Sequence, residues 1–269
     1  MASDNAVIRA ATWNVWWLFG EQWHRRERGI VATLEQWHPD VFGFQEAWAF
    51  GDRTQADALA EELGMHSAFV EPGLPVPPDP VEHPDQIGVR VGLGLLSRWS
   101  ITRAVPRELP SPGATLVAMQ ATIAHPLGDL HVIVAGTSGE PEHRAAHAAQ
   151  VAALGDIATD PVFDGPLPVL LLADLNADFE NESMHLLRQR LVDTWGTVNH
   201  GIDPRTLSAT NRFAPPDAEL QFNRRVDHVM ARAGRADAPV VVRSSWITRD
   251  EFEGLPPSDH YPVFTDFEV

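Results

Sequence analysis

Short runs of apolar residues that end in a polar residue recur along the chain. The clearest run is Val169–Leu172, which consists of four large aliphatic residues between Pro168 and a polar turn. Such a run is typical of a β-strand that is buried on both faces. Asp174 and Asn176 follow it, and the alternation of side chains along an extended chain predicts that they point the same way. An ordinary Asp-Leu-Asn turn is the alternative interpretation, because both polar residue types favour turns.

Four other segments repeat this form. Strands are predicted over residues 7–15, 40–44 and 224–230, and over the last residues of the chain. The polar residues at or near the ends of these strands are Asn14, Glu46, Asp227 and the pair Asp259 and His260. A carboxylate next to a buried strand costs free energy unless it is solvated, paired or bound to a metal. The repetition therefore indicates a polar site that is built from strand ends.

The spacing of apolar residues and the proline content define the other elements. Helices are predicted over residues 21–37, 52–63, 141–157 and 182–190, and further strands over residues 92–97, 101–105, 115–124, 130–135 and 240–245. The helix over residues 141–157 is expected to pack its alanines, among them Ala145, Ala148 and Ala149, on a sheet. Residues 71–86, with six prolines, and residues 205–220 are predicted loops. The first is expected to be either a lid over a binding site or an excursion without a role.

The order of these elements predicts one domain over residues 1–269. No internal repeat and no change in composition divides the chain. Helices alternate with strands in the outer parts of the chain, whereas strands follow strands in its middle. This order favours an α/β (α+β) fold with two packed sheets and helices outside over a single doubly wound sheet.

The acidic balance limits the partners that the chain is expected to bind. There are 37 Asp and Glu residues against 20 Lys and Arg residues, which gives a formal net charge of −17. A chain of this charge is not expected to bind duplex nucleic acid through a broad basic face. The charge does not exclude a nuclease, because a bound divalent cation supplies positive charge.

Features that the sequence lacks limit its cysteine chemistry, its membrane association and its expected location. It contains no Cys, which excludes disulfides, thiolate zinc sites and thiol nucleophiles. No apolar run approaches the roughly 20 residues of a membrane span, so stable membrane insertion is not expected, and no segment indicates a protein partner. The first residues lack the basic segment and apolar core of a signal peptide, so a cytoplasmic location is expected unless a signal was removed.

The strand-end residues form a set that suits hydrolysis of phosphate esters. The set consists of Asn14, Glu46, Asp174, Asn176, Asp227, Asp259 and His260. Carboxylates together with water suit Mg²⁺ or Mn²⁺. An amide can donate to a phosphoryl oxygen, and a carboxylate that bonds to a His orients the ring and makes it more basic. The expected site is therefore a hydrolytic one that uses a hard cation.

The motifs that carry this set resemble those of the endonuclease/exonuclease/phosphatase superfamily. The superfamily includes pancreatic-type deoxyribonucleases, exonuclease III-like repair nucleases, neutral sphingomyelinases and inositol polyphosphate 5-phosphatases. The matching segments, in the family's order, are TWNV at 12–15, FGFQEAW at 42–48, GLLSRWSI at 94–101, ADLNAD at 173–178, RRVDHVM at 224–230 and SDHYPV at 258–263. The resemblance implies a four-layer αββα sandwich, with two mixed sheets packed face to face, and metal-dependent hydrolysis of a phosphoester.

The same resemblance implies a role for each member of the set. Glu46 would be the principal metal ligand, with Asn14 beside it and Asp259 assisting. Asp174 would position or deprotonate the attacking water, and Asn176 would hold a phosphoryl oxygen. His260 would contact the phosphoryl group or act as the general base, and Asp227 would orient its ring. Attack would be in line, with charge developing on oxygens that the metal and the donors stabilise. Whether Asp174 or His260 accepts the proton is left open.

The chain departs from the family pattern at one step. Many members have Thr-His after the strand that matches residues 130–135, whereas this chain has Thr137 and Ser138. Either a phosphate donor is lost, or the pocket is reshaped around a different phosphoester. Gly136 and Gly139 flank the step and favour a small turn that another group approaches closely, and therefore the second alternative. His143 and His147 follow in the next helix and are predicted to lie on its surface.

The substrate is the least determined property. Arg25, Arg26 and Arg28 are expected on a solvated helix face, and Arg224 with Arg225 forms a second basic pair. A small phosphoester or a lipid head group suits the acidic balance better than nucleic acid does, with residues 48–50 as a modest apolar contact for a lipid surface. Trp16 and Trp17 are expected either to pack in the core or to border a cleft.

The sequence is also compatible with two alternatives to the hydrolysis of a small phosphoester. One is a DNA or RNA nuclease of the same family, which would need a basic or aromatic track for the nucleic acid. The other is a non-catalytic relative that binds ligands in the same cleft. The intact set of site residues argues against the second alternative.

Overall fold

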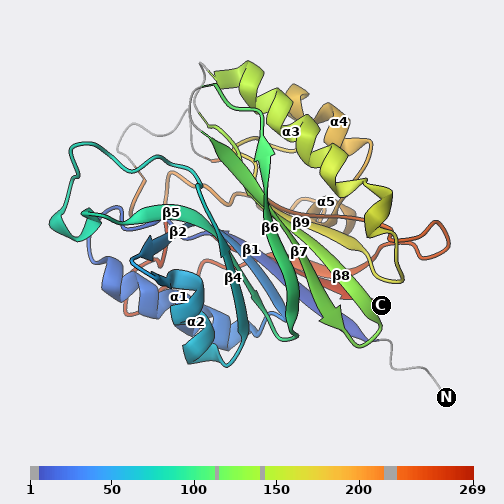
Figure 1. Ribbon diagram of the computed structural model, residues 1–269, viewed down its shortest axis with the longest axis horizontal. Helices are drawn as coiled ribbons and strands as arrows, with labels where there is room; N and C mark the ends of the chain where they lie inside the picture. The colour runs from blue at the N-terminus through green and yellow to red at the C-terminus, as the bar shows by residue number, and fades with distance from the viewer. Residues whose placement is uncertain (1–5, 113–114, 140–142, 215–222) are drawn as a thin grey trace.

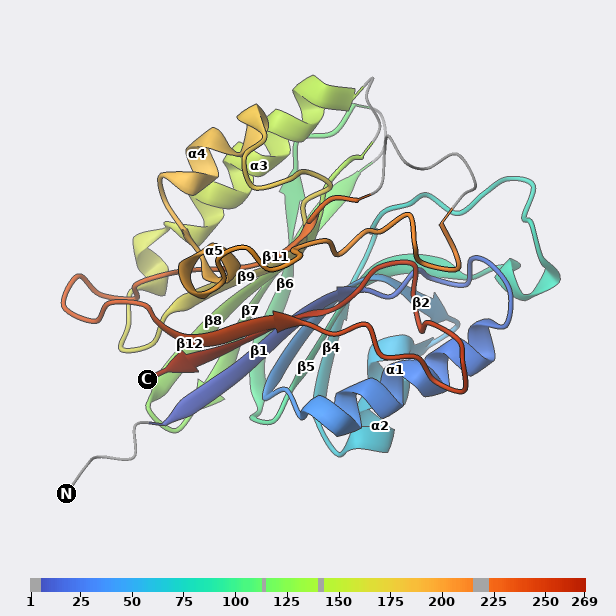
Figure 2. The same cartoon turned by 180° about the vertical axis from the view of Figure 1, so that it is seen from behind.

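Two β-sheets form the centre of the molecule, with helices on their outer faces (Figures 1 and 2). The computed structural model describes residues 6–112, 115–139, 143–214 and 223–269. The first sheet has the order β12 (Val241–Ile247), β13 (Val263–Glu268), β1 (Val7–Asn14), β2 (Val41–Phe50), β5 (Arg90–Ser97) and β4 (His66–Val70), with β3 (Arg53–Thr54) paired to β2. The second has the order β10 (Val192–Asp193), β11 (Asp227–Arg232), β9 (Val169–Asp174), β8 (Gly128–Gly136), β7 (Leu116–His125) and β6 (Ile101–Leu109). Both sheets are mixed, because β1 pairs in parallel with β2, and β8 with β9.

The helices complete a four-layer αββα sandwich. Two of them, α1 (Trp23–Trp37) and α2 (Gln55–Leu63), cover the outer face of the first sheet, and α3 (Arg144–Ala158) with α4 (His185–Arg188) covers the second. The short α5 (Thr194–Val198) lies at one edge of the sandwich, where the Oγ1 atom of Thr194 donates to the carbonyl of Val229 and bonds to Thr265 Oγ1 of the other sheet. Short 3₁₀ helices span Pro84–Gln86, Pro161–Phe163 and Glu182–Met184. The predicted fold class is confirmed.

The central strand β9 shows why the sequence adopts this arrangement. Leu170 and Leu172 face the core between the sheets, whereas Leu171 and Ala173 face the core beneath α3. Both faces of the strand are therefore buried, as its apolar run predicts. The sheets approach each other closely at Gly43 of β2, where an added Cβ would lie 2.9 Å from the Cβ of Leu172.

Strand direction brings the polar ends together. The chain leaves β1 and β9 at the same end of the sandwich, and the antiparallel partners β11 and β13 begin at that end. In β11, Asp227 is paired directly with Asp174 of β9. Residues far apart in the sequence therefore meet where the strands of both sheets end, on one side of the sandwich.

Some sequence predictions were wrong in detail. The strand predicted over residues 40–44 continues to Phe50, and β4, β3, β10 and α5 were not predicted. The predicted helix over residues 182–190 is a 3₁₀ turn followed by the four residues of α4. Residues 215–222 of the predicted loop 205–220 lie outside the described residues. Among the described residues, no helix is long and apolar enough to span a membrane.

The inward face of α3 also differs from the prediction. Ala145, Ala148 and Ala149 are exposed, and the helix buries His147, Gln150, Val151 and Leu154 instead. Alanines occur on several faces of this helix, so they do not determine which face packs. The larger side chains bury more area and therefore fix the orientation.

Candidate active site

Asn14 joins the two sheets at the site. Its Nδ2 atom donates to Glu46 Oε1 at 2.8 Å and to Asp174 Oδ2 at 2.9 Å, and its Oδ1 accepts from the backbone N–H of Trp16. Asn14 is buried at the end of β1. One amide therefore fixes the positions of two carboxylates that belong to different sheets.

Glu46 lies in a distorted part of β2. The pairing of β2 with β5 shifts between Phe44 and Ala47, and Glu46 has a φ of 56°. The positive φ is rare for a residue other than Gly, Asn or Asp, and this bulge turns the carboxylate toward the strand ends. Burial, followed by the nearby charge of Asp259, raises the pKa of Glu46 to about 8. Its Oε2 atom is buried and has no hydrogen-bond partner among the described residues.

Asp174 and Asn176 lie together because of a turn. Strand β9 ends at Asp174, and Asn176 has a φ of 49° and donates its backbone N–H to Asp174 Oδ1. The turn interpretation is thus correct, and strand alternation does not set their relative position. Burial and the charge of Asp227 raise the pKa of Asp174 to about 6. Asn176 Nδ2 donates to the carbonyl of Thr137 at 2.8 Å, which leaves its second N–H for a ligand.

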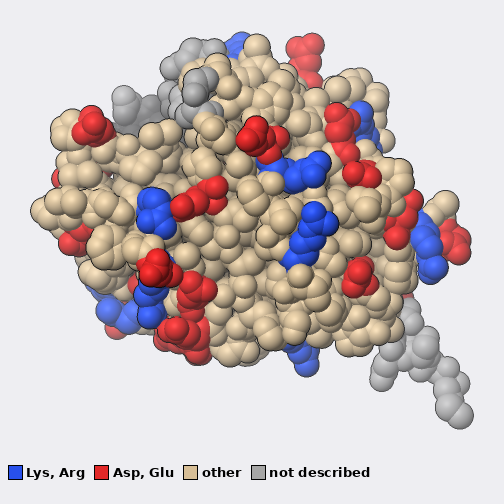
Figure 3. All heavy atoms as spheres, viewed as in Figure 1, with Lys and Arg blue, Asp and Glu red and all other residues tan. Residues whose placement is uncertain are grey.

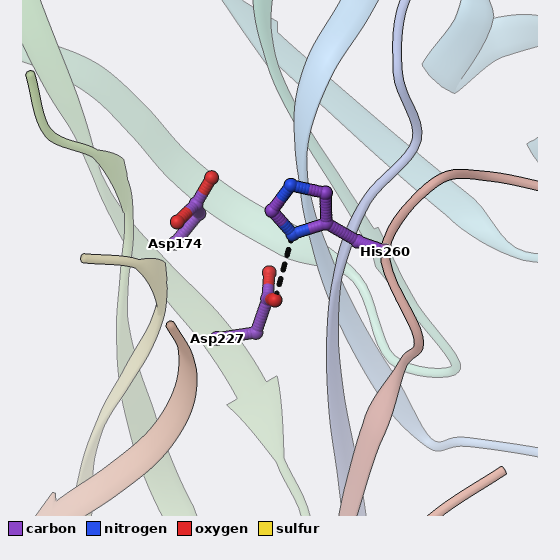
Figure 4. A group of neighbouring side chains, drawn as sticks. All are labelled: Asp174, Asp227 and His260. Carbon is purple, nitrogen blue, oxygen red and sulfur yellow. Dashed lines mark hydrogen bonds and ion pairs between the residues drawn. The ribbon is translucent and has the colours of Figure 1, made fainter. Parts of the chain in front are cut away.

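His260 and Asp227 form a buried pair (Figure 4). His260 Nδ1 lies 2.8 Å from Asp227 Oδ2, and Asp227 is fully buried at the start of β11. Burial alone would lower the pKa of His260, but the charges of Asp227 and Asp259 raise it well above its ordinary value. The Nε2 atom of the ring remains available to the site. The potential ligand atoms of Asp174, Asp227 and His260 lie within 4.8 Å of one another.

Asp259 is held by its neighbours in the segment before β13. Ser258 Oγ donates to the carbonyl of Asn14 at 2.7 Å and accepts from the N–H of His260. Asn211 Nδ2 donates to the carbonyls of Ser258 and Asp259. Burial raises the pKa of Asp259. The structure thus brings all seven predicted residues to one region, and Ser258 and Asn211, which the sequence analysis missed, hold that region in place.

Arg26 corrects the prediction that the first arginine cluster is solvated. Its guanidinium is buried and donates to the carbonyls of Phe19, Trp17 and Pro257, at 2.6, 3.2 and 3.2 Å. It also lies 4.7 Å from the ring of Trp16. Burial lowers its pKa to about 10, against the opposing charges of Asp259 and Glu46. The spacing from Arg26 to the buried Ile30, one helical turn away, was the available signal in the sequence.

The two tryptophans have different environments. Trp17 is buried, whereas Trp16 is half-buried and packs against Phe213, with ring centroids 4.8 Å apart.

Arg225 of the second basic pair is also buried, and its guanidinium forms two 2.7 Å bonds to Asp193. It therefore stabilises the fold and does not form part of a basic track.

The turn at Ser138 is tied to α3 by Gln150. The backbone N–H of Ser138 donates to Gln150 Oε1 at 2.9 Å, and Gln150 Nε2 donates to Ser138 Oγ at 3.0 Å. An added Cβ at Gly139 would lie 2.8 Å from Asn176 Oδ1, so this turn requires a glycine.

The prediction of a surface position for His147 was wrong: it is buried and its Nε2 bonds to the carbonyl of Leu175.

The buried carboxylates fit a divalent cation. Glu46 Oε2 is a buried oxygen to which no residue in the described part of the chain donates. The pKa values of Glu46, Asp174 and Asp259 are all raised. Raised pKa values show that positive charge is too scarce to compensate the burial of these groups. An all-oxygen set of this kind matches the preference of Mg²⁺ and Mn²⁺.

Known proteins share the sequence pattern and the fold. The sequence model of the Endonuclease/Exonuclease/phosphatase family matches residues 11–260. A search of curated protein sequences finds no match. Among solved structures, an endonuclease/exonuclease/phosphatase from Beutenbergia cavernae DSM 12333 is 23% identical, with a TM-score of 0.73, over 98% of this chain and 72% of that chain.

Two further solved structures are similar in fold. TDP2 from D. rerio, complexed with single strand DNA product, is 15% identical with a TM-score of 0.77, over 98% of this chain and 100% of that chain. The human Nocturnin catalytic domain with bound sulfate anion is 18% identical with a TM-score of 0.72, over 97% of this chain and 94% of that chain. At these identities the likeness establishes the fold.

Proposed function

The chain belongs to the endonuclease/exonuclease/phosphatase family, whose members hydrolyse phosphoester bonds, and on this premise we propose that it is a Mg²⁺- or Mn²⁺-dependent phosphodiesterase or phosphatase. Its proposed substrate is a small phosphoester or a lipid head group, and residues 1–269 are proposed to act as one domain. The observation that carries this proposal is the contact of Asn14 with both Glu46 and Asp174.

That contact supports different roles for the two carboxylates, with Glu46 binding the cation and Asp174 acting on the water. Glu46, Asn14 and Asp259 would hold the cation, because Glu46 Oε2 lacks a partner within the ranges that the structure describes. The alternative group of Asp174, Asp227 and His260 is less suitable, because His260 Nδ1 is already bonded to Asp227. When bound, the cation supplies positive charge that stabilises the phosphoryl oxygens in the transition state.

The remaining residues would act on the water and on the phosphoryl group. Asp174 would orient the attacking water, with Asn14 and the N–H of Asn176 fixing its two oxygens. Asn176 would donate its second Nδ2 proton to a phosphoryl oxygen. His260 would present Nε2 to the phosphoryl group, with Asp227 holding the ring through Nδ1. Such fixed donors stabilise the transition state without reorganising.

Nucleic acid is the second candidate substrate. The similar TDP2 structure contains a single strand DNA product, which supports a nuclease. Against this, the chain has a formal net charge of −17, and the face in Figure 3 shows acidic and basic side chains interspersed without a continuous basic track. The charge therefore favours a small phosphoester.

A hydrolysis panel tests the proposal. Bis-p-nitrophenyl phosphate, p-nitrophenyl phosphate, plasmid DNA, RNA and sphingomyelin would each be incubated with the protein after chelation, and again after Mg²⁺ or Mn²⁺ is added. We expect turnover of at least one small ester or of sphingomyelin only in the presence of the cation. Turnover that persists in excess chelator, or no turnover of any substrate with either cation, would contradict the proposal.

A further inference from the structure

A cleft of about 1170 Å³ opens beside the site on the side of Asn176. Asn176 and Ser138 line the cleft together with three arginines, Arg144, Arg188 and Arg224. Its other walls come from α3 and from the segment that leads into α4, and these two helices lie side by side in Figures 1 and 2. We propose that this arginine cleft binds a second phosphate group of the substrate, so that the enzyme prefers bisphosphates. The inference rests on the proposed function.

Arg224 is fixed at the boundary between the cleft and the site. Its backbone N–H donates to the carbonyl of Leu207, and its own carbonyl accepts from the N–H groups of Thr206 and Leu207. The guanidinium Nη1 lies 3.4 Å from the carbonyl of Asn176, the residue proposed to hold a phosphoryl oxygen. A substrate bound at Asn176 would therefore have this guanidinium beside it.

The other two arginines line the same cleft. Arg188 Nη1 donates to the carbonyl of Phe179 at 2.6 Å, and its guanidinium lies 5.8 Å from the ring of Phe179. Arg144 lies at the start of α3 and is exposed. In the part of the chain that the structure describes, Arg144 has no carboxylate partner. A guanidinium binds phosphate through two parallel N–H bonds, so this lining suits a phosphate group.

Two acids among the described residues, Glu180 and Glu182, also line the cleft. Glu180 lies 3.7 Å from Arg188, and its side chain is 88% exposed to solvent. Glu182 is also exposed. Their charges are screened by water and salt. The chain has 37 acids and 20 basic residues. Among the described residues that line the cleft, three arginines against two acids therefore reverse the overall balance locally.

Ser138 keeps the cleft connected to the site. Because Gln150 fixes its backbone and its hydroxyl, the side chain cannot swing away, and Gly139 allows Asn176 to approach the same turn. A small residue at position 138 leaves room for a substrate to extend from the phosphoryl site into the cleft. Ser138, which replaces the His of many family members, would in this way let the substrate reach the three arginines of the cleft.

Matched substrates that differ by one phosphate test the inference. One pair is the p-nitrophenyl ester of thymidine 5′-phosphate, with and without a 3′-phosphate, and the other is fructose 1,6-bisphosphate and fructose 1-phosphate. We expect kcat/KM in Mn²⁺ to be about tenfold higher for the bisphosphate of at least one pair, which is equivalent to about 1.4 kcal/mol. R224Q and R144Q should each reduce this preference severalfold.

The control variant is R190Q, which removes an arginine that pairs with Asp156 and does not line the cleft. It should keep the preference. S138H should lower kcat/KM for the preferred bisphosphate, because the imidazole fills the connection. The inference is overturned if bis-p-nitrophenyl phosphate is hydrolysed but neither pair shows a preference, or if R190Q reduces the preference as much as R224Q does. Failure to hydrolyse bis-p-nitrophenyl phosphate or any other substrate with either cation would instead overturn the proposed function.

Discussion

Asn14 couples the groups proposed to bind the cation to those proposed to act on water. A neutral amide suits this position, because it satisfies Glu46 and Asp174 without adding charge. The cluster keeps a shortage of positive charge, which shows in the raised pKa values of both carboxyl groups. At the scale of single residues, the site is thus prepared for a cation.

Glu46→Gln should weaken cation binding more than any other single change in the set. The substitution keeps the shape of the side chain and the contact with Asn14 but removes the charge. We expect the Mn²⁺ affinity measured by calorimetry to fall by at least about tenfold, or 1.4 kcal/mol. Glu27→Gln is the matched control, since Glu27 is a half-buried glutamate that accepts from Trp48 Nε1 and lies outside the predicted set. Unchanged affinity in Glu46→Gln would remove Glu46 from the cation site.

Asp227→Asn and His260→Gln should lower kcat by similar amounts, each about 10²-fold or more. If Asp227 acts by orienting the ring, the double variant should lose little more than either single variant. The measurement is a double-mutant cycle on kcat with bis-p-nitrophenyl phosphate. Strictly additive losses would refute the pairing. A lowered melting temperature with normal turnover would show that Asp227 is purely structural.

His228 should make the stability of the fold depend on pH. It is fully buried, its Nε2 bonds to the carbonyl of Ala177, and burial lowers its pKa to about 4. Because the folded protein disfavours the charged ring, its contribution is complete above the unfolded pKa of about 6.5 and is lost as the pH falls toward 4. The loss should reach about 3 kcal/mol.

Urea denaturation of the wild type and His228→Gln at several pH values measures this contribution. The variant should lose less stability than the wild type between about pH 7 and pH 4. Parallel pH profiles for the two proteins would show that the pKa of His228 is the same in the folded and unfolded states, which would contradict the prediction.

The chemistry of single residues was easier to predict than their surroundings. All seven predicted site residues were chosen from strand ends, because acids and amides after apolar runs are a local signal, and the structure brings the seven together in one region. Gln150 and Asn211 were missed, since what they contact is decided by packing between segments distant in sequence. His147 was placed on the surface for the same reason, because a lone polar residue in a helix gives no sign of its bonded carbonyl.

At the scale of elements, the bulge in β2 and the two loops held by Arg26 set the geometry of the site. The bulge turns Glu46 toward the strand ends. Arg26 of α1 ties the segment after β1 to the segment before β13 through the carbonyls of Phe19 and Pro257. The proposed ligands Asn14 and Asp259 flank these two segments, so the position of α1 affects the site directly.

Arg26→Gln should therefore reduce stability by about 3 kcal/mol, because it leaves several buried carbonyls without a donor. Urea denaturation would measure the change. Arg25→Gln is the matched control on the exposed side of the same helix, where Arg25 pairs with Glu253, and it should cost less than about 1 kcal/mol. Equal effects of the two substitutions would show that the carbonyl contacts of Arg26 contribute little.

Element boundaries were predicted well where the apolar pattern was strong. The strands β1, β7 and β9 agree with the prediction to within two residues at each end. The strand β4 was missed because its sequence, HSAFV, is short and lacks clear alternation. It forms as the edge partner of β5, so tertiary pairing determines it.

At the scale of the whole molecule, the two sheets bring five separate chain segments together on the side of the sandwich where their strands end or begin. Each segment alone is compatible with an ordinary turn or a solvated acid. The fold makes the combination specific. The parallel neighbours β1 and β2 present their C-terminal ends on this side of the sandwich, where the antiparallel partners β11 and β13 present their N-terminal ends. The overall negative charge supports the proposed small substrate, and the arginine cleft is the proposed site of its second phosphate.

The turnover of bis-p-nitrophenyl phosphate by Asp174→Asn in saturating Mn²⁺ tests the central claim most directly. The substitution keeps the size of the side chain but removes the group proposed to orient or deprotonate the water, so kcat should fall by about 10²–10⁴-fold. Asp178→Asn is the matched control in the same segment, since its amide oxygen can still accept from the N–H of Arg225. It should retain wild-type turnover. A kcat for Asp174→Asn within about threefold of the wild-type value would contradict the assignment of this strand-end cluster as the hydrolytic site, because loss of a general base costs far more.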